Sequence, residues 1–98
     1  MDSRMETFII IDLEATCWCS GSSPDQMEVI EIGAVRLITP AWGTYGAFQR
    51  FVRPVDEPLL SDFCRELTSI TQEDVDGAET FPEVLREFLE WAGPNPFS

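Results

Sequence analysis

The sequence predicts an α+β domain in which three antiparallel strands precede the helices. Apolar runs with strand character fill the first half, at residues 6–12, 27–38 and 47–53, and segments with helical periodicity fill the second half. The connections between the runs are short, which favours an antiparallel meander. We therefore expect a three-stranded meander, then short helices, then one long helix packed on the sheet.

The first two runs are the most apolar parts of the chain. Residues 6–12 are β-branched and unbroken and predict a buried strand that ends near its acidic residues. Residues 27–38 are long enough to predict the central strand. Between them, residues 19–26 are rich in Gly, Ser and Pro and predict a loop.

The third run mixes aromatic residues with polar ones and predicts a strand at residues 47–53. Pro40, Gly43 and Gly46 predict the connection that leads into it. Pro54 ends the strand because proline cannot donate to a sheet hydrogen bond.

Three segments in the second half carry helix-start signals. Ser61–Leu67 predicts one or two helical turns, and Thr71–Asp74 has the form of a capped helix start. Thr80–Glu83 adds a capping-box glutamate and a proline in the first turn, and Gly93–Pro94 ends the long helix that follows. One face of this helix is apolar at 3.6-residue spacing: Phe81, Val84, Leu85, Phe88, Leu89 and Ala92.

The charge balance limits the ways in which this chain can bind nucleic acid. The 98 residues carry 18 acids and six basic residues, for a formal charge of -12, and contain no histidine. A protein that binds nucleic acid through a broad basic surface has the opposite composition. Either the partner is not nucleic acid, or nucleic acid is held through bound divalent cations and a small local patch.

Cysteine usage predicts an intracellular, cytoplasmic protein. Cys17, Cys19 and Cys64 are odd in number, and the C-x-C pair is too close in a strand to form a normal disulfide. A zinc site is not expected, because the usual set of four Cys and His ligands is missing. The apolar run at the start is too short for a signal peptide or a membrane span.

Two carboxylates at the end of the first apolar run predict a cation site. Side chains at i and i+2 of a strand project to the same face, roughly 6–7 Å apart, so Asp12 and Glu14 lie together, and Thr16 joins them if the extension continues. Hard cations such as Mg²⁺ and Mn²⁺ prefer carboxylate oxygens. Glu31 lies inside the second apolar run, where a charge needs a partner, so we expect three acids to converge. The alternative is that Asp12 caps a turn and Glu14 faces water.

Four segments, taken together, resemble the DEDD superfamily of 3′→5′ exonucleases. In chain order they are FIIIDLEATCW, MEVIEIGAVRL, FQRFVRPV and LTSITQEDVDGAETFPEVLREFLEW. They are most similar to the branch that trims histone mRNA and small RNAs, and the resemblance covers about Thr7 to Trp91. It implies a ribonuclease H-like fold, with a mixed five-stranded sheet whose first three strands are antiparallel. The chain is then one partial exonuclease domain, residues 1–98.

The resemblance also implies roles for individual residues. Asp12 and Glu14 match two of four acidic metal ligands that hold two Mg²⁺ or Mn²⁺ ions, with Asp12 bridging both and Glu14 orienting the attacking water. The reaction implied is hydrolysis of the terminal phosphodiester at the 3′ end of single-stranded RNA or DNA.

Other matched positions line the pocket for the terminal nucleotide. They include Thr16, Leu67 and Ile70, and Trp18 lies beside them as a base-stacking candidate. Leu67 and Ile70 are equally well interpreted as core residues, and Trp18 as a packed loop aromatic. Glu31 is expected to support the site through a partner such as an arginine, not to bind metal directly.

The chain departs from the family pattern in its second half. The second-motif Asp, the third-motif His and the final Asp are not found. We therefore expect a truncated, N-terminal half of the domain, inactive or crippled alone, that self-associates or swaps through the open edge of its first strand. The alternative is a non-catalytic acidic module for oligomerisation or protein binding.

Overall fold

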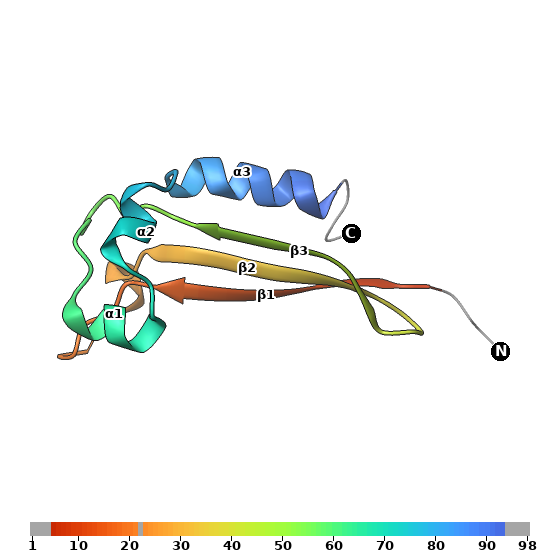
Figure 1. The fold of residues 1–98 in the computed structure, drawn as a ribbon, viewed down its shortest axis with the longest axis horizontal. Coiled ribbons are helices and arrows are strands. Elements are labelled where there is room, and N and C mark those ends of the chain that lie inside the picture. Colours follow the sequence, from red (N-terminus) through yellow and green to blue (C-terminus); the bar gives the residue numbers. More distant parts are fainter. Residues whose placement is uncertain (1–4, 22, 94–98) are drawn as a thin grey trace.

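The computed structural model describes residues 5–21 and 23–93, and it confirms the predicted order of strands before helices (Figure 1). The three strands form one antiparallel sheet in the order β1-β2-β3, so β2 is central as expected. The elements are β1 (Thr7–Ala15), the 3-10 turn η1 (Pro24–Gln26), β2 (Val29–Ile38), β3 (Gly43–Phe51), α1 (Asp62–Thr68), α2 (Gln72–Asp76) and α3 (Phe81–Ala92).

Strand β1 is longer than the sequence predicted. It continues through both acids to Ala15, and Asp12 pairs with Gly33 while Glu14 pairs with Glu31. The predicted end of the strand near residue 12 is therefore wrong. Cross-strand pairing with β2 overrides the weak local preference of acidic residues for turns.

Strand β3 begins at Gly43, four residues before its predicted start. The expectation that Gly43 and Gly46 belong to the connection is wrong, because both lie in the strand. The register shifts near Arg36, where β3 carries one extra residue, and Gly46 has a φ of +138°. Only glycine adopts that conformation readily, so Gly46 allows the bulge that keeps β3 paired.

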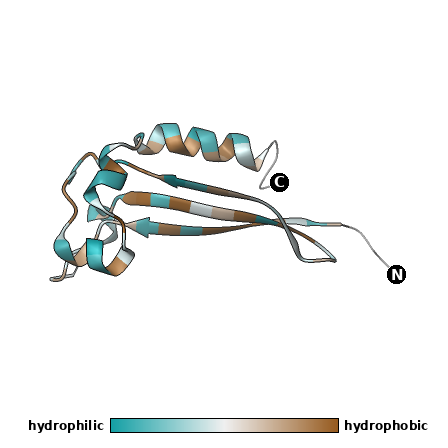
Figure 2. Cartoon of the chain, viewed as in Figure 1, coloured by the Kyte–Doolittle hydropathy of each residue, from teal (hydrophilic) through white to brown (hydrophobic). Residues whose placement is uncertain are grey.

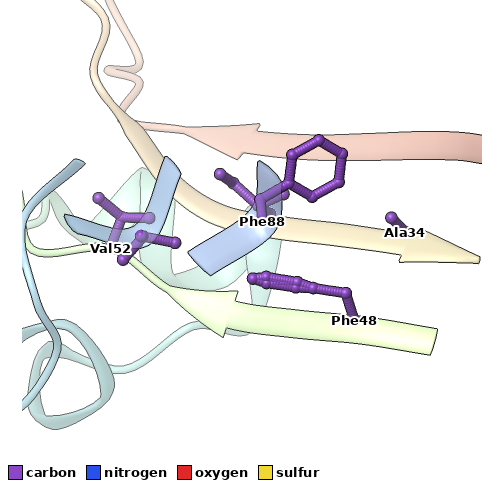
Figure 3. Close-up of a cluster of buried hydrophobic side chains, with 6 residues drawn as sticks. Ala34, Phe48, Val52 and Phe88 are labelled. Atoms are coloured by element: carbon purple, nitrogen blue, oxygen red, sulfur yellow. The ribbon is translucent and has the colours of Figure 1, made fainter. Parts of the chain in front are cut away.

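Helix α3 packs on one face of the sheet through a small core (Figure 3). Val84 and Phe88 are its buried residues, and the rings of Phe48 and Phe88 stack with centroids 5.5 Å apart. The buried members of this core are Ile32, Ala34, Phe48, Val52, Val84 and Phe88.

The apolar face of α3 is wider than its contact with the sheet. Phe81, Leu85 and Leu89 are exposed, while Trp91 packs against the core from the last turn. Those three side chains of the predicted apolar face therefore lie outside the contact with the sheet. A sheet of three strands covers only part of a stripe that repeats over 12 residues.

Helices α1 and α2 form a second core at the end of the sheet where β1 ends (Figure 1). Its buried members are Ile30, Leu60, Cys64, Ile70 and Val75. The predicted helix starts are confirmed: Ser61 caps α1 and Thr71 forms a capping box with Asp74. None of the helices in the described part of the chain is long and apolar enough to cross a membrane.

Strand β1 is largely exposed, although its apolar run predicted a buried strand. Ile10 is 54% exposed and Leu13 is 53% exposed, so both faces of β1 are open. Among the described residues no strand pairs with its outer edge. The hydropathy colouring shows this apolar strand at the open side of the sheet (Figure 2). The prediction of burial is wrong, whereas the expected apolar face and open edge are present.

Candidate active site

The carboxylates of Asp12 and Glu14 project from β1 to the face of the sheet opposite α3. Strand side chains alternate, and Ile9 of the same strand packs against the α3 core, so residues at even positions face away from it. Asp12 is exposed and Glu14 is half-buried. Within residues 5–21 and 23–93, no arginine and no main-chain amide neutralises either carboxylate. The pair is therefore available to a cation.

Glu31 lies directly opposite Glu14 on β2. Like charges in a direct cross-strand pair destabilise a sheet. The Nε2 amide of Gln49 on β3 donates to Glu31 Oε2 at 2.8 Å, which holds one of the two acids. Glu31 therefore has a hydrogen-bonding partner as expected, and that partner is Gln49, not an arginine.

The three acids do not form a three-ligand cluster. The described residues contain no group of three or more His, Cys, Asp or Glu side chains that could hold a metal ion. The expectation that Asp12, Glu14 and Glu31 converge is therefore wrong, because Glu31 is turned to Gln49. What remains is a two-carboxylate arrangement on one strand.

Gly33 leaves space beside this pair, although no role was expected for it from the sequence. It lies opposite Asp12 on β2, where a Cβ added to the glycine would be 3.7 Å from the Asp12 carbonyl oxygen, an ordinary contact. A glycine inside a strand often marks a close approach by a ligand or another backbone. The isolated Gly within the run Val29–Val35 was the available sequence signal.

Thr16 directly follows β1, and its side chain does not lie on the open face with Asp12 and Glu14. The register shifts between Glu14 and Ala15, and Thr16 is buried. Its hydroxyl accepts the Glu28 N–H at 2.9 Å, and its own N–H donates to the Glu28 carbonyl at 2.8 Å. These bonds hold the strand exit in place, and a role toward a nucleotide stays a prediction.

Trp18 lines a hollow of about 430 Å³ that is bounded by residues 18–21 and 25–26 on one side and by residues 56–57 on the other. Asp12 and Glu14 do not line this hollow, whereas three other acids do: Asp25, Asp56 and Glu57. A ring in such a position is accessible to a base, and stacking by Trp18 stays a prediction.

The two remaining pocket candidates lie in different environments. Leu67 is 66% exposed on α1, whereas Ile70 is 4% exposed within the α1–α2 core. Packing in the core alone explains the position of Ile70, which agrees with its interpretation as a core residue. Leu67 is open to solvent, and the nucleotide contacts of both residues stay predictions.

Glu28 organises the loop beside the hollow, and sequence reasoning missed it. Its carboxylate accepts the backbone N–H groups of Val55, Asp56 and Glu57 at 2.8, 3.0 and 3.1 Å. Bonds to an ionised carboxylate are among the stronger hydrogen bonds in proteins. No local periodicity predicts this contact, because its two ends are 27 to 29 residues apart.

Comparison with known proteins decides the family. A family model described as Exonuclease, RNase_T, matches residues 9–96. The chain belongs to this exonuclease family. The ribonuclease H-like fold expected from the resemblance is confirmed, because solved exonuclease structures superpose on the sheet and helices with TM-scores of 0.84 to 0.86.

Three relatives illustrate the match to this exonuclease family. The human "3′-5′ exoribonuclease 1" is 45% identical over 91 residues, covering 92% of this chain and 26% of that protein. The nuclease domain of 3′hExo, a DEDDh family member bound to rAMP, is 42% identical, with a TM-score of 0.86 over 94% of this chain and 46% of that one. A 3′-exonuclease solved for 3′-end-specific recognition of the histone mRNA stem-loop is 42% identical, with a TM-score of 0.84 over 92% of this chain and 40% of that one. The chain thus spans about a quarter of the length of the human relative.

Proposed function

We propose that this chain supplies the first acidic motif of a divalent-metal-dependent 3′→5′ exonuclease that acts on single-stranded RNA or DNA ends. One observation carries the proposal: Asp12 and Glu14 share the open face of β1 without a neutralising arginine or amide among the described residues. The family membership and the relatives' 3′-5′ exoribonuclease activity support the same chemistry.

The residues present fit part of a site for Mg²⁺ or Mn²⁺. Both carboxylates offer the hard oxygen donors that these ions prefer, and Gly33 leaves room above Asp12. When bound, such ions supply positive charge that activates water and stabilises the leaving oxygen of a phosphodiester. Asp12 and Glu14 would hold the ions, while Gln49 keeps the Glu31 carboxylate turned toward β3.

We propose that the 98-residue chain alone has negligible nuclease activity. It contains no histidine, the residue that most often acts as a general base, and its described residues contain no three-ligand metal cluster. Loss of a general base alone costs about 10²- to 10⁴-fold in rate. The -12 charge adds repulsion toward a polyanion that only bound cations would offset.

The test compares this chain with a version joined to the remainder of the human relative's nuclease domain. Both are incubated with Mn²⁺ and 5′-labelled RNA and DNA oligonucleotides, after cooperative unfolding has shown that each is folded. We expect a ladder of 3′-shortened products from the joined version, none from this chain, and none from the joined version carrying Asp12→Asn. Inactivity of a folded joined version on both substrates would contradict the proposal.

A second candidate function is a non-catalytic acidic module that binds itself or a protein partner. The exposed apolar side chains of β1 favour it, as does the outer edge of β1, which pairs with no strand among the described residues. The two functions differ in their response to metal, because only the nuclease-derived site requires Asp12 and Glu14 to bind a cation.

A further inference from the structure

Two cysteines that are far apart in the sequence meet next to the candidate active site. Cys17 follows the end of β1, and Cys64 lies in the first turn of α1. Cys17 packs against the core cluster that contains Cys64, and the Cys64 thiol lies near enough to raise the pKa of Cys17. Both thiols are free, as is the exposed Cys19.

One hydroxyl group ties together the backbones of these two cysteines. Ser61 Oγ donates to the Cys17 carbonyl at 2.6 Å and accepts the Cys64 N–H at 3.0 Å. Cys64 Sγ also donates to the Ala15 carbonyl at 3.8 Å, two residues before Cys17. The approach of the two thiols is therefore set by main-chain contacts, and a disulfide forms without strain only where the backbone already brings the two side chains close.

We propose that Cys17 and Cys64 are an oxidisable dithiol that closes to a disulfide and locks the end of β1 onto α1. With oxidised glutathione, one cysteine thiolate attacks a glutathione sulfur and releases the first glutathione thiolate. The second cysteine thiolate then attacks the mixed disulfide and releases the second. Two protein thiols lose two electrons and two protons, and two molecules of reduced glutathione result.

The unequal burial of the two thiols sets the order and the rate of these steps. Cys17 is half-buried and Cys64 is fully buried, so an oxidant reaches Cys17 first. Burial, the neighbouring Cys64 thiol and the charge of Glu14 raise the pKa of Cys17 to about 11. The reactive thiolate is therefore scarce near neutral pH, and closure is slow there and faster in mildly alkaline solution.

Closure has a consequence that does not depend on nuclease activity. The disulfide would enclose residues 17–64, which contain β2 and β3. A cross-link over a loop of this size restricts the unfolded chain and stabilises the fold. We therefore expect a higher melting temperature for the oxidised chain.

The test uses the Cys19→Ser chain, which keeps only the pair. The folded chain is treated with oxidised glutathione, its remaining thiols are alkylated, and it is digested with trypsin. The arginines place the two cysteines in different peptides, residues 5–36 and 51–65, since Arg53 precedes a proline. We expect these two peptides to be disulfide-linked, and the melting temperature to be higher than that of the reduced chain.

The control is the Cys17→Ser, Cys19→Ser chain, which we expect to give no linked peptide and no oxidant-dependent rise in melting temperature. Three results would overturn the proposal. One is a folded chain in which each thiol carries its own glutathione, and another is a covalent dimer without the internal link. The third is a linked chain that melts at a lower temperature, because the contacts of Ser61 predict closure without strain.

Discussion

The carboxylates of Asp12 and Glu14 depend on the small residue beside them. Gly33 lies opposite Asp12 and leaves the open face of the sheet uncrowded at that point. A valine at this position suits a strand and adds a side chain next to the carboxylates. A substitution of Gly33 can therefore change access to the carboxylates without a large change in the stability of the sheet.

Gly33→Val is expected to keep the fold while blocking a cation. The melting temperature without metal should change little, and the rise produced by millimolar Mn²⁺ should be lost. The control is Thr44→Val, which adds a valine at an exposed position of β3. A Mn²⁺ response that survives Gly33→Val would show that the ion lies elsewhere.

Among single residues, Glu28 is expected to stabilise the fold more than an exposed acid does. Glu28→Gln removes an ionised acceptor from three backbone N–H groups and should lower the free energy of unfolding by about 1–3 kcal/mol. Urea denaturation measures the change, and faster hydrogen exchange at residues 55–57 locates it. Glu66→Gln removes the same charge from an exposed helix position, and an equal loss there would refute the role of the three bonds.

Side-chain contacts hold both ends of helix α3, one with the sheet and one within the helix. At its C-terminal end, the Arg36 guanidinium of β2 lies over the Trp91 ring, 4.4 Å from the centroid, and donates to the Trp91 carbonyl. At its start, Thr80 N–H and the Thr80 hydroxyl both donate to Glu83 Oε1. These contacts orient a helix whose Phe81, Leu85 and Leu89 side chains remain exposed.

Arg36→Ala is expected to loosen the end of α3. The loss combines a cation–π contact and a hydrogen bond, so the free energy of unfolding should fall by about 1–2 kcal/mol. Arg86→Ala removes the same charge from the exposed side of the helix and should change stability by less than about 0.5 kcal/mol. Equal effects of the two substitutions in urea denaturation would argue against a specific Arg36–Trp91 contact.

The start of α3 is expected to respond to pH in two opposite senses. The hydrogen bonds from Thr80 hold the pKa of Glu83 below its ordinary value of 4.5, so this stabilisation is present above pH 4.5 and is lost as the pH falls through the lowered pKa. The hydrogen bond and charge of Glu87 raise the pKa of Glu79. The stabilisation of the fold by protonated Glu79 is therefore present below pH 4.5 and is lost as the pH rises through the raised pKa.

Urea midpoints measured across acidic to neutral pH test these signs. Glu83→Gln should reduce the loss of stability in acid, because the residue that must take up a proton is gone. Glu79→Gln should remove the decline that accompanies ionisation of Glu79, since an amide donates to Glu87 at every pH. Unchanged pH profiles in both variants would contradict the assigned hydrogen bonds.

The limits of sequence prediction are clearest for the elements. The capping boxes at Thr71 and Thr80 were predictable, because their partners are only three residues away. The exposure of β1 was not predictable from its apolar run. The burial of a strand depends on which other elements cover it, and the sequence of the strand itself does not contain that information. The bonds of Glu28, the pairing of Glu31 with Gln49 and the Cys17–Cys64 contact join distant residues and leave no local pattern.

At the scale of the whole molecule, the described chain is elongated and open along β1. It measures 53 × 24 × 23 Å, and its radius of gyration of 16.0 Å exceeds the roughly 13 Å typical of a compact domain of about 100 residues. An exposed apolar strand with an unpaired edge invites pairing with another chain. We therefore predict that this chain self-associates through β1.

Ile10→Lys tests that prediction, because it places a charge on the open face of β1 without touching the α3 core. Sedimentation or light scattering over a range of concentrations should show dimers or larger assemblies for the unaltered chain and a shift to monomer for the variant. Val55→Lys changes an equally exposed apolar residue in a loop and should leave association unchanged. A monomeric unaltered chain at high concentration would contradict the prediction.

The most direct test of the central claim is a Mn²⁺ titration followed by NMR line broadening. If Asp12 and Glu14 hold a cation, the amide resonances of those residues and of Gly33 broaden first, and Asp12→Asn abolishes the effect while Glu90→Gln, an exposed acid on α3, does not. Broadening that begins at the acids around Trp18, or that is unchanged in Asp12→Asn, would contradict the claim that the two carboxylates of β1 form the metal site.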